Sequence, residues 1–123
     1  MKPLTSPKLA PYLLARDASG LARFIEDGIG AKRGFQEIDK SGKVNHLELQ
    51  IADSVVMLAD APSGSSPFPA MIHLYVTDAD AAYERALKAG ATSLRKPSDR
   101  PDGRRGGVRD PWGNQWWFTQ PLA

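Results

Sequence analysis

The second half of this 123-residue chain repeats the order of its first half about sixty residues later. Residues 13–18 and 74–79 are both apolar runs that end in Asp-Ala, and Gly-Ala pairs follow them at 30–31 and 90–91. A repeat of this length is one supersecondary unit rather than a solenoid module. We predict a single domain over 1–123, built from units at about 9–60 and 70–120 with a linker at 61–69. Two such units are expected to enclose a groove, where small ligands usually bind.

Each unit is predicted to contain one helix and several short strands. In the first unit we expect a strand at 9–16, a helix capped by Asp17, and strands at 35–39, 44–51 and 55–59. In the second we expect a strand at 71–76, a helix that begins near Asp78 and ends at Gly90, and strands at 92–95, 106–110 and 116–119. The Pro/Gly-rich segment 96–104 is predicted to be a loop. Helices that alternate with antiparallel meanders place the chain in the α+β class.

The composition excludes several kinds of chemistry. The chain has no cysteine, so disulfides, thiolate metal ligands and thiol nucleophiles are excluded. Residues 2–7 are interrupted by prolines and do not resemble a signal peptide, and no apolar run is long enough to cross a bilayer. We therefore expect a cytoplasmic protein with no membrane partner.

Basic residues crowd into one short segment, and the net charge is nevertheless only +2. The cluster consists of Arg95, Lys96, Arg100, Arg104, Arg105 and Arg109. Three interleaved aspartates favour a solvated loop with local ion pairs, and no aromatic residue interrupts the cluster as nucleic-acid binding would require. We expect no nucleic-acid partner, and an anionic small ligand is the better use of this charge.

Several local sequences, taken in order, resemble the vicinal oxygen chelate superfamily of glyoxalase I, extradiol dioxygenases and bleomycin-resistance proteins. They are Pro11-Tyr12-Leu13, Arg16-Asp17-Ala18, His46-Leu47-Glu48-Leu49, Ile51, Asp53-Ser54, Val56-Met57-Leu58, His73-Leu74-Tyr75-Val76, Arg109-Asp110-Pro111, Gly113-Asn114 and Trp116. They span nearly the whole chain and are most similar to the glyoxalase-like or PhnB-like branch. The resemblance implies two βαβββ units whose eight strands form a cup-like mixed sheet, and a homodimer. It does not by itself imply one function.

In the metal enzymes of this family, the first and last strand of each unit each supply a His or Glu ligand. The resemblance places the four ligand positions at Ala10, Met57, Met71 and Trp117. Alanine and tryptophan offer no ligand atom, and methionine sulfur is too soft for Zn, Ni, Fe or Mn. We therefore expect neither a metal nor another cofactor.

Strand alternation predicts which side chains face the cup, because the face with Leu47, Leu49 and Ile51 must pack against the helices. The expected cup face holds Tyr12, Leu14, His46, Glu48, Gln50, Val55, Met57, Met71, His73, Tyr75, Trp117 and Thr119. The residues expected to contact a ligand are Tyr12, His46, Gln50, Met57, Met71, Tyr75, Arg105 and Trp117. Methionine and tryptophan make an adaptable surface for a flat organic molecule.

Two histidines and a carboxylate are the candidate acid–base groups. His73, acting with Glu48, is the best candidate for proton transfer, although a histidine among tyrosines is often only a satisfied core residue. His46 and Glu48 share one strand face and form either a ligand contact or a solvent-exposed pair.

Trp117 and two arginines are candidates for ligand binding. Trp117 either stacks on a ligand or fills the cup, and Trp116 must then face the core. By the family plan, Arg105 and Arg109 lie near the mouth of the cup, where they bind a carboxylate or phosphate or pair with Asp102 or Asp110.

The sequence thus favours a metal-independent protein that binds or sequesters a small apolar or aromatic molecule, as antibiotic-resistance members of the family do. The alternative is a lyase, isomerase or dioxygenase-like enzyme that uses His73 and Glu48 as acid–base groups. A third hypothesis is an atypical metal site made by His46, Glu48 and His73.

Overall fold

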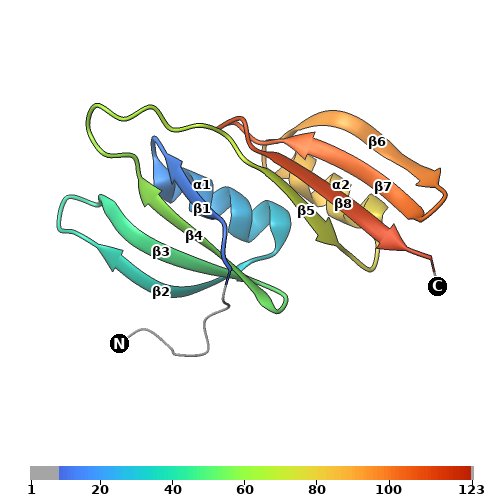
Figure 1. The fold of residues 1–123 in the computed structure, drawn as a ribbon, viewed down its shortest axis with the longest axis horizontal. Coiled ribbons are helices and arrows are strands. Elements are labelled where there is room, and N and C mark those ends of the chain that lie inside the picture. Colours follow the sequence, from blue (N-terminus) through green and yellow to red (C-terminus); the bar gives the residue numbers. More distant parts are fainter. Residues whose placement is uncertain (1–8, 123) are drawn as a thin grey trace. The chain divides into compact units, whose positions relative to one another are not determined.

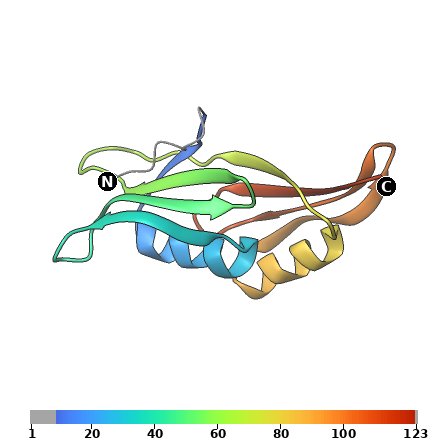
Figure 2. The same ribbon diagram turned by 90° about the horizontal axis from the view of Figure 1, so that it is seen from below.

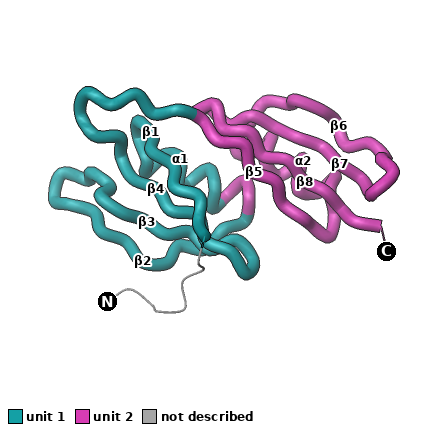
Figure 3. The backbone as a smooth tube through the Cα atoms, in the orientation of Figure 1, with its two compact units in different colours: residues 1–26, 30–68 teal, residues 27–29, 69–123 magenta. Residues whose placement is uncertain are grey.

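The computed structural model describes residues 9–122 and divides the chain into two units (Figure 3). Unit 1 contains the chain up to residue 26 and residues 30–68, and unit 2 contains residues 27–29 and the chain from residue 69. Residues 2–7, which we compared with a signal peptide, lie outside the described part. No helix in the described part is long and apolar enough to cross a membrane.

Unit 1 contains a four-stranded mixed sheet and a helix (Figure 1). Its elements are β1 (Tyr12–Ala15), α1 (Ala18–Phe24), a π-helical turn η1 (Ile25–Ile29) that runs on into unit 2, β2 (Lys32–Ile38), β3 (Val44–Ile51) and β4 (Ser54–Asp60). The strand order is β1-β4-β3-β2, with β1 parallel to β4 and the other pairs antiparallel.

Unit 2 repeats this topology. Its elements are β5 (Met71–Tyr75), α2 (Ala79–Lys88), β6 (Thr92–Arg100), β7 (Gly103–Arg109) and β8 (Gln115–Pro121). The strand order is β5-β8-β7-β6, with β5 parallel to β8. The α+β class and the βαβββ plan predicted from the sequence are confirmed, with the eight strands divided between two four-stranded mixed sheets.

The two helices begin in the same way. Asp17 Oδ1 accepts a hydrogen bond from the amide of Gly20, and Asp78 Oδ1 accepts one from the amide of Ala81. Both aspartates are the N-caps that the sequence predicted, because a carboxylate satisfies amides that have no partner in the first turn.

A side chain near the end of the last strand of each unit also holds the helix start. Asp60 Oδ1 accepts from the amide of Ala18 at 2.8 Å, and Gln120 Oε1 accepts from the amide of Ala79 at 3.0 Å. The internal repeat is therefore present in the hydrogen bonding as well as in the topology.

Each helix packs on one face of the sheet in its own unit (Figure 2). In unit 1, Leu47 and Leu49 are fully buried, as the sequence predicted, and Ile51, predicted for the same face, is half-buried. Leu58, which is paired with Leu47, is fully buried as well. In unit 2, Trp116 and Phe118 are buried in the same way. We call the opposite face of each sheet its open face, because no helix of the same unit covers it within the described residues.

The prediction of a loop at 96–104 is wrong, because β6 continues to Arg100 and β7 begins at Gly103. Pro97 falls at a register shift of β6, an edge strand, where a missing N–H removes no regular ladder bond. A Cβ on Gly106 would lie 2.9 Å from the ring of Pro97. The prolines and glycines here reflect close approach of two strands rather than a loop.

Candidate functional site

The open face of unit 2 carries three rows of side chains that cross all four strands. Paired residues share a face, so the register places the members of each row side by side. The middle row is His73, Trp117, Gly107 and Arg95, and the flanking rows are Tyr75, Thr119, Arg105 and Ser98, and Met71, Gln115, Arg109 and Thr92. Most of the candidate residues predicted for the second half of the chain are therefore brought together here.

Trp117 lies at the centre of this face, with its ring over Gly107. A Cβ on Gly107 would come within 2.6 Å of Cδ2 and Cζ3 of the indole, so only glycine admits the ring at this position. The indole Nε1 donates to Oε1 of Gln115 at 3.0 Å, and the side chain is partly exposed. The neighbouring Trp116 is fully buried, so the predicted alternation of the two tryptophans is confirmed.

The edge of this face at β5 is apolar and aromatic. Met71 is 70% exposed and Tyr75 is 75% exposed, and His73 is exposed between them. The rings of His73 and Tyr75 have centroids 5.1 Å apart. Exposed apolar side chains beside a tryptophan are an adaptable binding surface.

A hydrogen-bonded chain fixes His73 and Arg105. Arg105 Nε donates to Thr119 Oγ1 at 2.9 Å, and this hydroxyl lies 2.7 Å from His73 Nε2. When the threonine hydroxyl donates to His73, Nε2 is the acceptor and the ring proton is on Nδ1. The sequence predicts that Thr119 lies on this face but assigns it no role, because its bridging position depends on the conformation of the Arg105 side chain.

Arg105 also forms the ion pair with Asp102 that was the alternative to ligand binding, with Nη2 and Oδ2 2.6 Å apart. Asp110, the other predicted partner of the arginines, accepts hydrogen bonds from other groups instead. Its carboxylate accepts from the amides of Trp112 and Asn114, the side-chain amide of Asn114 and the indole of Trp116. Asp110 therefore holds the turn between β7 and β8.

Arg104 belongs to the other side of the same strand. It pairs with Asp80 of α2 at 2.8 Å and with Asp99 at 2.9 Å. The hydrogen bond from Arg104 holds the pKa of Asp80 below its usual value, and the two carboxylates raise the pKa of Arg104. Neighbouring arginines on β7 thus have different surroundings.

The open face of unit 1 holds a chain of three polar side chains. Tyr12 Oη lies 2.9 Å from His46 Nδ1, and His46 Nε2 lies 2.9 Å from Glu48 Oε2. When Glu48 is ionised, it accepts from Nε2, and Nδ1 of the neutral ring then accepts from the tyrosine hydroxyl. This arrangement can relay a proton between the tyrosine hydroxyl and the carboxylate.

His46 and Glu48 do form a pair, but Glu48 is only 6% exposed, so the alternative of a solvent-exposed pair is wrong in its exposure. Met57 is paired with Tyr12 on β1 and with Glu48 on β3. Phe35 lies beside His46, with ring centroids 6.0 Å apart. The sequence did not identify Phe35, because a register shift between Arg33 and Gln36 alters which side of β2 it faces.

Not all candidate residues join these clusters. Gln50 donates from Nε2 to the carbonyl of Ala52 instead. His73 and Glu48, the predicted acid–base pair, belong to different units, and each is hydrogen-bonded to a residue of its own unit. Their joint role remains a prediction.

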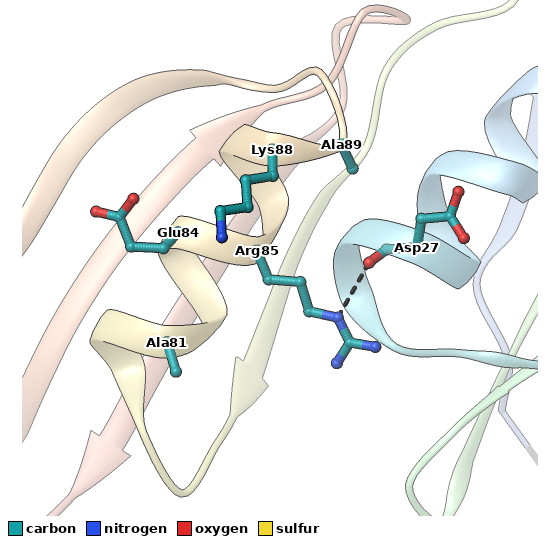
Figure 4. Close-up of a pocket in the computed structure, with 6 residues that line it drawn as sticks. All are labelled: Asp27, Ala81, Glu84, Arg85, Lys88 and Ala89. Atoms are coloured by element: carbon teal, nitrogen blue, oxygen red, sulfur yellow. Dashed lines mark hydrogen bonds between the residues drawn. The ribbon is translucent and has the colours of Figure 1, made fainter.

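Each unit also contains a pocket. In unit 1, a pocket of about 490 Å³ is bordered by Tyr12, Leu14 and Ala59 of the open face. In unit 2, a pocket of about 530 Å³ lies along α2 (Figure 4) and is lined by Asp27, Ala81, Glu84, Arg85, Lys88 and Ala89. Arg85 Nε donates to the carbonyl of Asp27 there at 3.0 Å. The mixed charges of this second pocket match none of the predicted site residues.

The four family positions for metal ligands do not fit a hard divalent cation. Met71 is largely exposed, and Met57 packs between neighbouring strands in the other unit. Trp117 can only donate from its indole, and Ala10 has no ligand atom. Within residues 9–122, no group of three or more His, Cys, Asp or Glu side chains is placed to hold a metal ion. The predicted lack of a cofactor remains an expectation.

Comparisons with known proteins agree with this architecture. The family model for the Glyoxalase/Bleomycin resistance protein/Dioxygenase superfamily matches residues 11–118. The uncharacterized protein Mb0911c of Mycobacterium bovis is 35% identical over 128 residues, which cover 94% of this chain and 84% of the relative.

Two solved structures share the fold. TioX from Micromonospora sp. ML1 has a TM-score of 0.80 and 23% identity, over 95% of this chain and all of that chain. TnmS3, an antibiotic binding protein from Streptomyces sp. CB03234, has a TM-score of 0.74 and 22% identity, over 98% of this chain and all of that chain. With the repeated βαβββ units and the match over 11–118, the chain belongs to the Glyoxalase/Bleomycin resistance protein/Dioxygenase superfamily.

Proposed function

We propose that this protein binds a small apolar or aromatic organic molecule without the help of a metal ion. The observation that carries this proposal is the indole of Trp117, which lies over Gly107 and is partly exposed beside Met71 and Tyr75. An aromatic ligand stacked on the indole gains about 0.5–1.5 kcal/mol beyond the burial of its surface. Sequestration of a flat organic compound requires stacking and apolar contact, and it does not require a catalytic group or a metal ion.

The family supports the proposal without fixing the ligand. TnmS3, which shares the fold, is an antibiotic binding protein, so this architecture can serve binding. The family ligand positions of this chain lack donors for a hard cation, which favours binding over metal catalysis. We propose an antibiotic or a similar compound as the ligand, and a cytoplasmic homodimer as the form that binds it.

A fluorescence titration tests the proposal. A panel of aromatic antibiotics should quench the protein, and Trp117→Phe should remove most of the change, because the ligand is expected to stack on that indole. Trp112→Phe is the matched control, since Trp112 lies in the turn before β8 rather than on the open face. Failure of every compound to change the emission, or an equal change in the Trp117→Phe variant, would overturn binding at this surface.

Two further measurements test the remaining parts of the proposal. Elemental analysis of protein purified without chelator or an affinity metal should find no stoichiometric Zn, Ni, Fe or Mn, and a stoichiometric metal would contradict metal independence. Light scattering coupled to size-exclusion chromatography should give the mass of a dimer, and a monomer mass would contradict the homodimer.

The chain of Tyr12, His46 and Glu48 favours one second candidate, a lyase, isomerase or dioxygenase-like enzyme. A buried carboxylate that orients an imidazole is a common arrangement for general acid–base catalysis. Under this hypothesis a bound compound is converted to product, and His46→Gln abolishes the conversion while binding persists. Recovery of every bound compound unchanged would reject it.

A further inference from the structure

We propose that the open face of unit 2 selects aromatic ligands that carry an oxyanion, such as a carboxylate or phosphate, and that Arg105 and Arg109 recognise this group. This inference rests on the proposed binding function and adds a ligand class to it. Three features of this face support the inference. They are its charged groups, the partners of those groups and their position relative to Trp117.

The open face of unit 2 is positively charged. Arg105 and Arg109 lie in the rows on either side of Trp117, and Arg95 is paired with Gly107 in the middle row. The only carboxylate that pairs with these arginines within the described residues is Asp102, which binds Arg105. Arg109 is exposed and forms no ion pair with any described residue.

Nearby carboxylates that could neutralise the arginines are occupied elsewhere. Asp110 follows Arg109 directly but is 3% exposed and accepts hydrogen bonds from backbone and side-chain N–H groups of its own turn. Asp99 and Asp80 bind Arg104, whose paired residue on β8 is Gln120 rather than Thr119. Strand alternation therefore separates Arg104, which has two carboxylate partners, from Arg105, which has one, and from Arg109, which has none among the described residues.

The guanidinium of Arg105 is held in a fixed position before a ligand binds. Thr119 and Asp102 hold the guanidinium through Nε and Nη2. A guanidinium fixed in this way loses little freedom when it binds an oxyanion, and its planar array of donors matches carboxylate and phosphate. Arg109 can then supply a second, more mobile charge from the adjacent row of the same strand.

The position of these groups predicts how a ligand lies. Apolar and aromatic side chains occupy β5, the indole occupies β8, and the arginines occupy β7. Neighbouring strands are about 4.8 Å apart, so a bicyclic aromatic ligand over Trp117 on β8 lies between the side chains of β5 and those of β7. Its apolar end would lie toward Met71 and Tyr75, and its oxyanion toward Arg105 and Arg109.

Four probes that share a naphthalene ring and differ in the group at its 2-position test the inference by isothermal titration calorimetry. They are 2-naphthoate, 2-naphthyl phosphate, the neutral 2-naphthamide and the cationic 2-naphthylmethylammonium. Charge-assisted hydrogen bonds are about twice as strong as neutral ones, so an oxyanion should bind roughly tenfold more tightly than the amide. The cation should bind most weakly, and the preference should shrink as salt is raised.

Matched variants show which arginines recognise the oxyanion. Arg109→Gln should weaken the binding of 2-naphthoate several-fold and leave the affinity for 2-naphthamide unchanged. The double variant with Arg105→Gln and Arg109→Gln should bind the oxyanions no more tightly than the amide. Arg104→Gln removes the same charge from the opposite face of β7 and should leave the preference intact. Circular dichroism checks that each variant is folded.

The outcomes separate the two proposals. Equal binding of amide and oxyanions, or an equal loss in Arg104→Gln and Arg109→Gln, would overturn anion selection while the binding function stands. Absence of binding for all four probes would overturn both. A preference for only one of the two oxyanions would identify the recognised group.

Discussion

The two units build different surfaces on equivalent positions of two sheets with the same topology. In unit 1, Met57 pairs with Tyr12 and Glu48, whereas in unit 2, Trp117 pairs with His73 and Gly107. The buried carboxylate of one sheet is thus replaced by a glycine in the other, and the indole takes the space that the glycine leaves. The two units share a backbone frame, but different side chains on it give a polar hydrogen-bonded chain in unit 1 and an aromatic surface in unit 2.

The next row shows the same divergence. His46 of unit 1 occupies the position that Arg105 occupies in unit 2. His46 lies two residues before Glu48 in β3, and Arg105 lies two residues before Gly107 in β7. His46 is held by Tyr12 and Glu48, and Arg105 by Thr119 and Asp102. One unit therefore presents a titratable ring and the other a permanent positive charge.

The turns before the last strands also differ, and this difference gives the largest expected effect. Asp110→Ala removes the acceptor of several N–H groups that are largely buried, so we expect a loss of about 3–5 kcal/mol of folding free energy. Asp53→Ala in the tight turn of unit 1 is the control, because among the described residues Asp53 accepts only from the exposed Ser54 hydroxyl, and its loss should cost less than about 0.5 kcal/mol. Urea denaturation of both variants measures the difference, and equal losses would refute this account of the turns.

The second-largest expected loss of stability comes from replacing Gly107, the glycine under the indole of Trp117. Gly107→Ala should cost about 1–3 kcal/mol and displace Trp117, because its Cβ overlaps the ring. Gly34→Ala is the matched change in β2 of unit 1, where the new Cβ would meet Glu48 O at an ordinary 3.5 Å. Thermal unfolding and near-UV circular dichroism should change for the first variant only. If Gly107→Ala is as stable as the parent protein and keeps its near-UV spectrum, the glycine does not determine the position of the ring.

The smallest expected change in stability concerns the ion pair of Asp80 and Arg104, which lies on the helix side of the sheet of unit 2. Because Arg104 lowers the pKa of Asp80, the stabilisation from Asp80 is present above the usual carboxyl value of 3.8 and is lost as pH falls through the lowered pKa. Asp80→Asn should therefore be slightly less stable than the parent at pH 7, and the two should converge at strongly acidic pH and in high salt. Denaturant titrations over pH measure this gap, and a gap that widens on acidification would reverse the sign argued here.

Local sequence was sufficient for the helices and for most strands. Aspartate N-caps, the alternation of β3 and the apolar run of β5 each depend on neighbours along the chain, and all three predictions hold. The loop predicted at 96–104 failed because Pro97 is tolerated by an edge strand, and edge position is a property of the sheet.

The candidate site was predictable by face but not by contact. Alternation placed Tyr12, His46 and Glu48 together on one face, yet burial of Glu48 depends on the pairing of β3 with both β2 and β4. The same limit applies to Thr119, whose bridge to His73 depends on Arg105 from another strand.

The sequence by itself determined the repeated βαβββ plan and the side chains available on each strand face, because periodicity and capping act over a few residues. The family followed from the resemblance of its ordered local sequences to a known superfamily. The tertiary structure alone decided which of those side chains meet. Strand pairing joins residues far apart in the chain, and it brought Trp117 over Gly107 and gave Glu48 its buried contact with an imidazole.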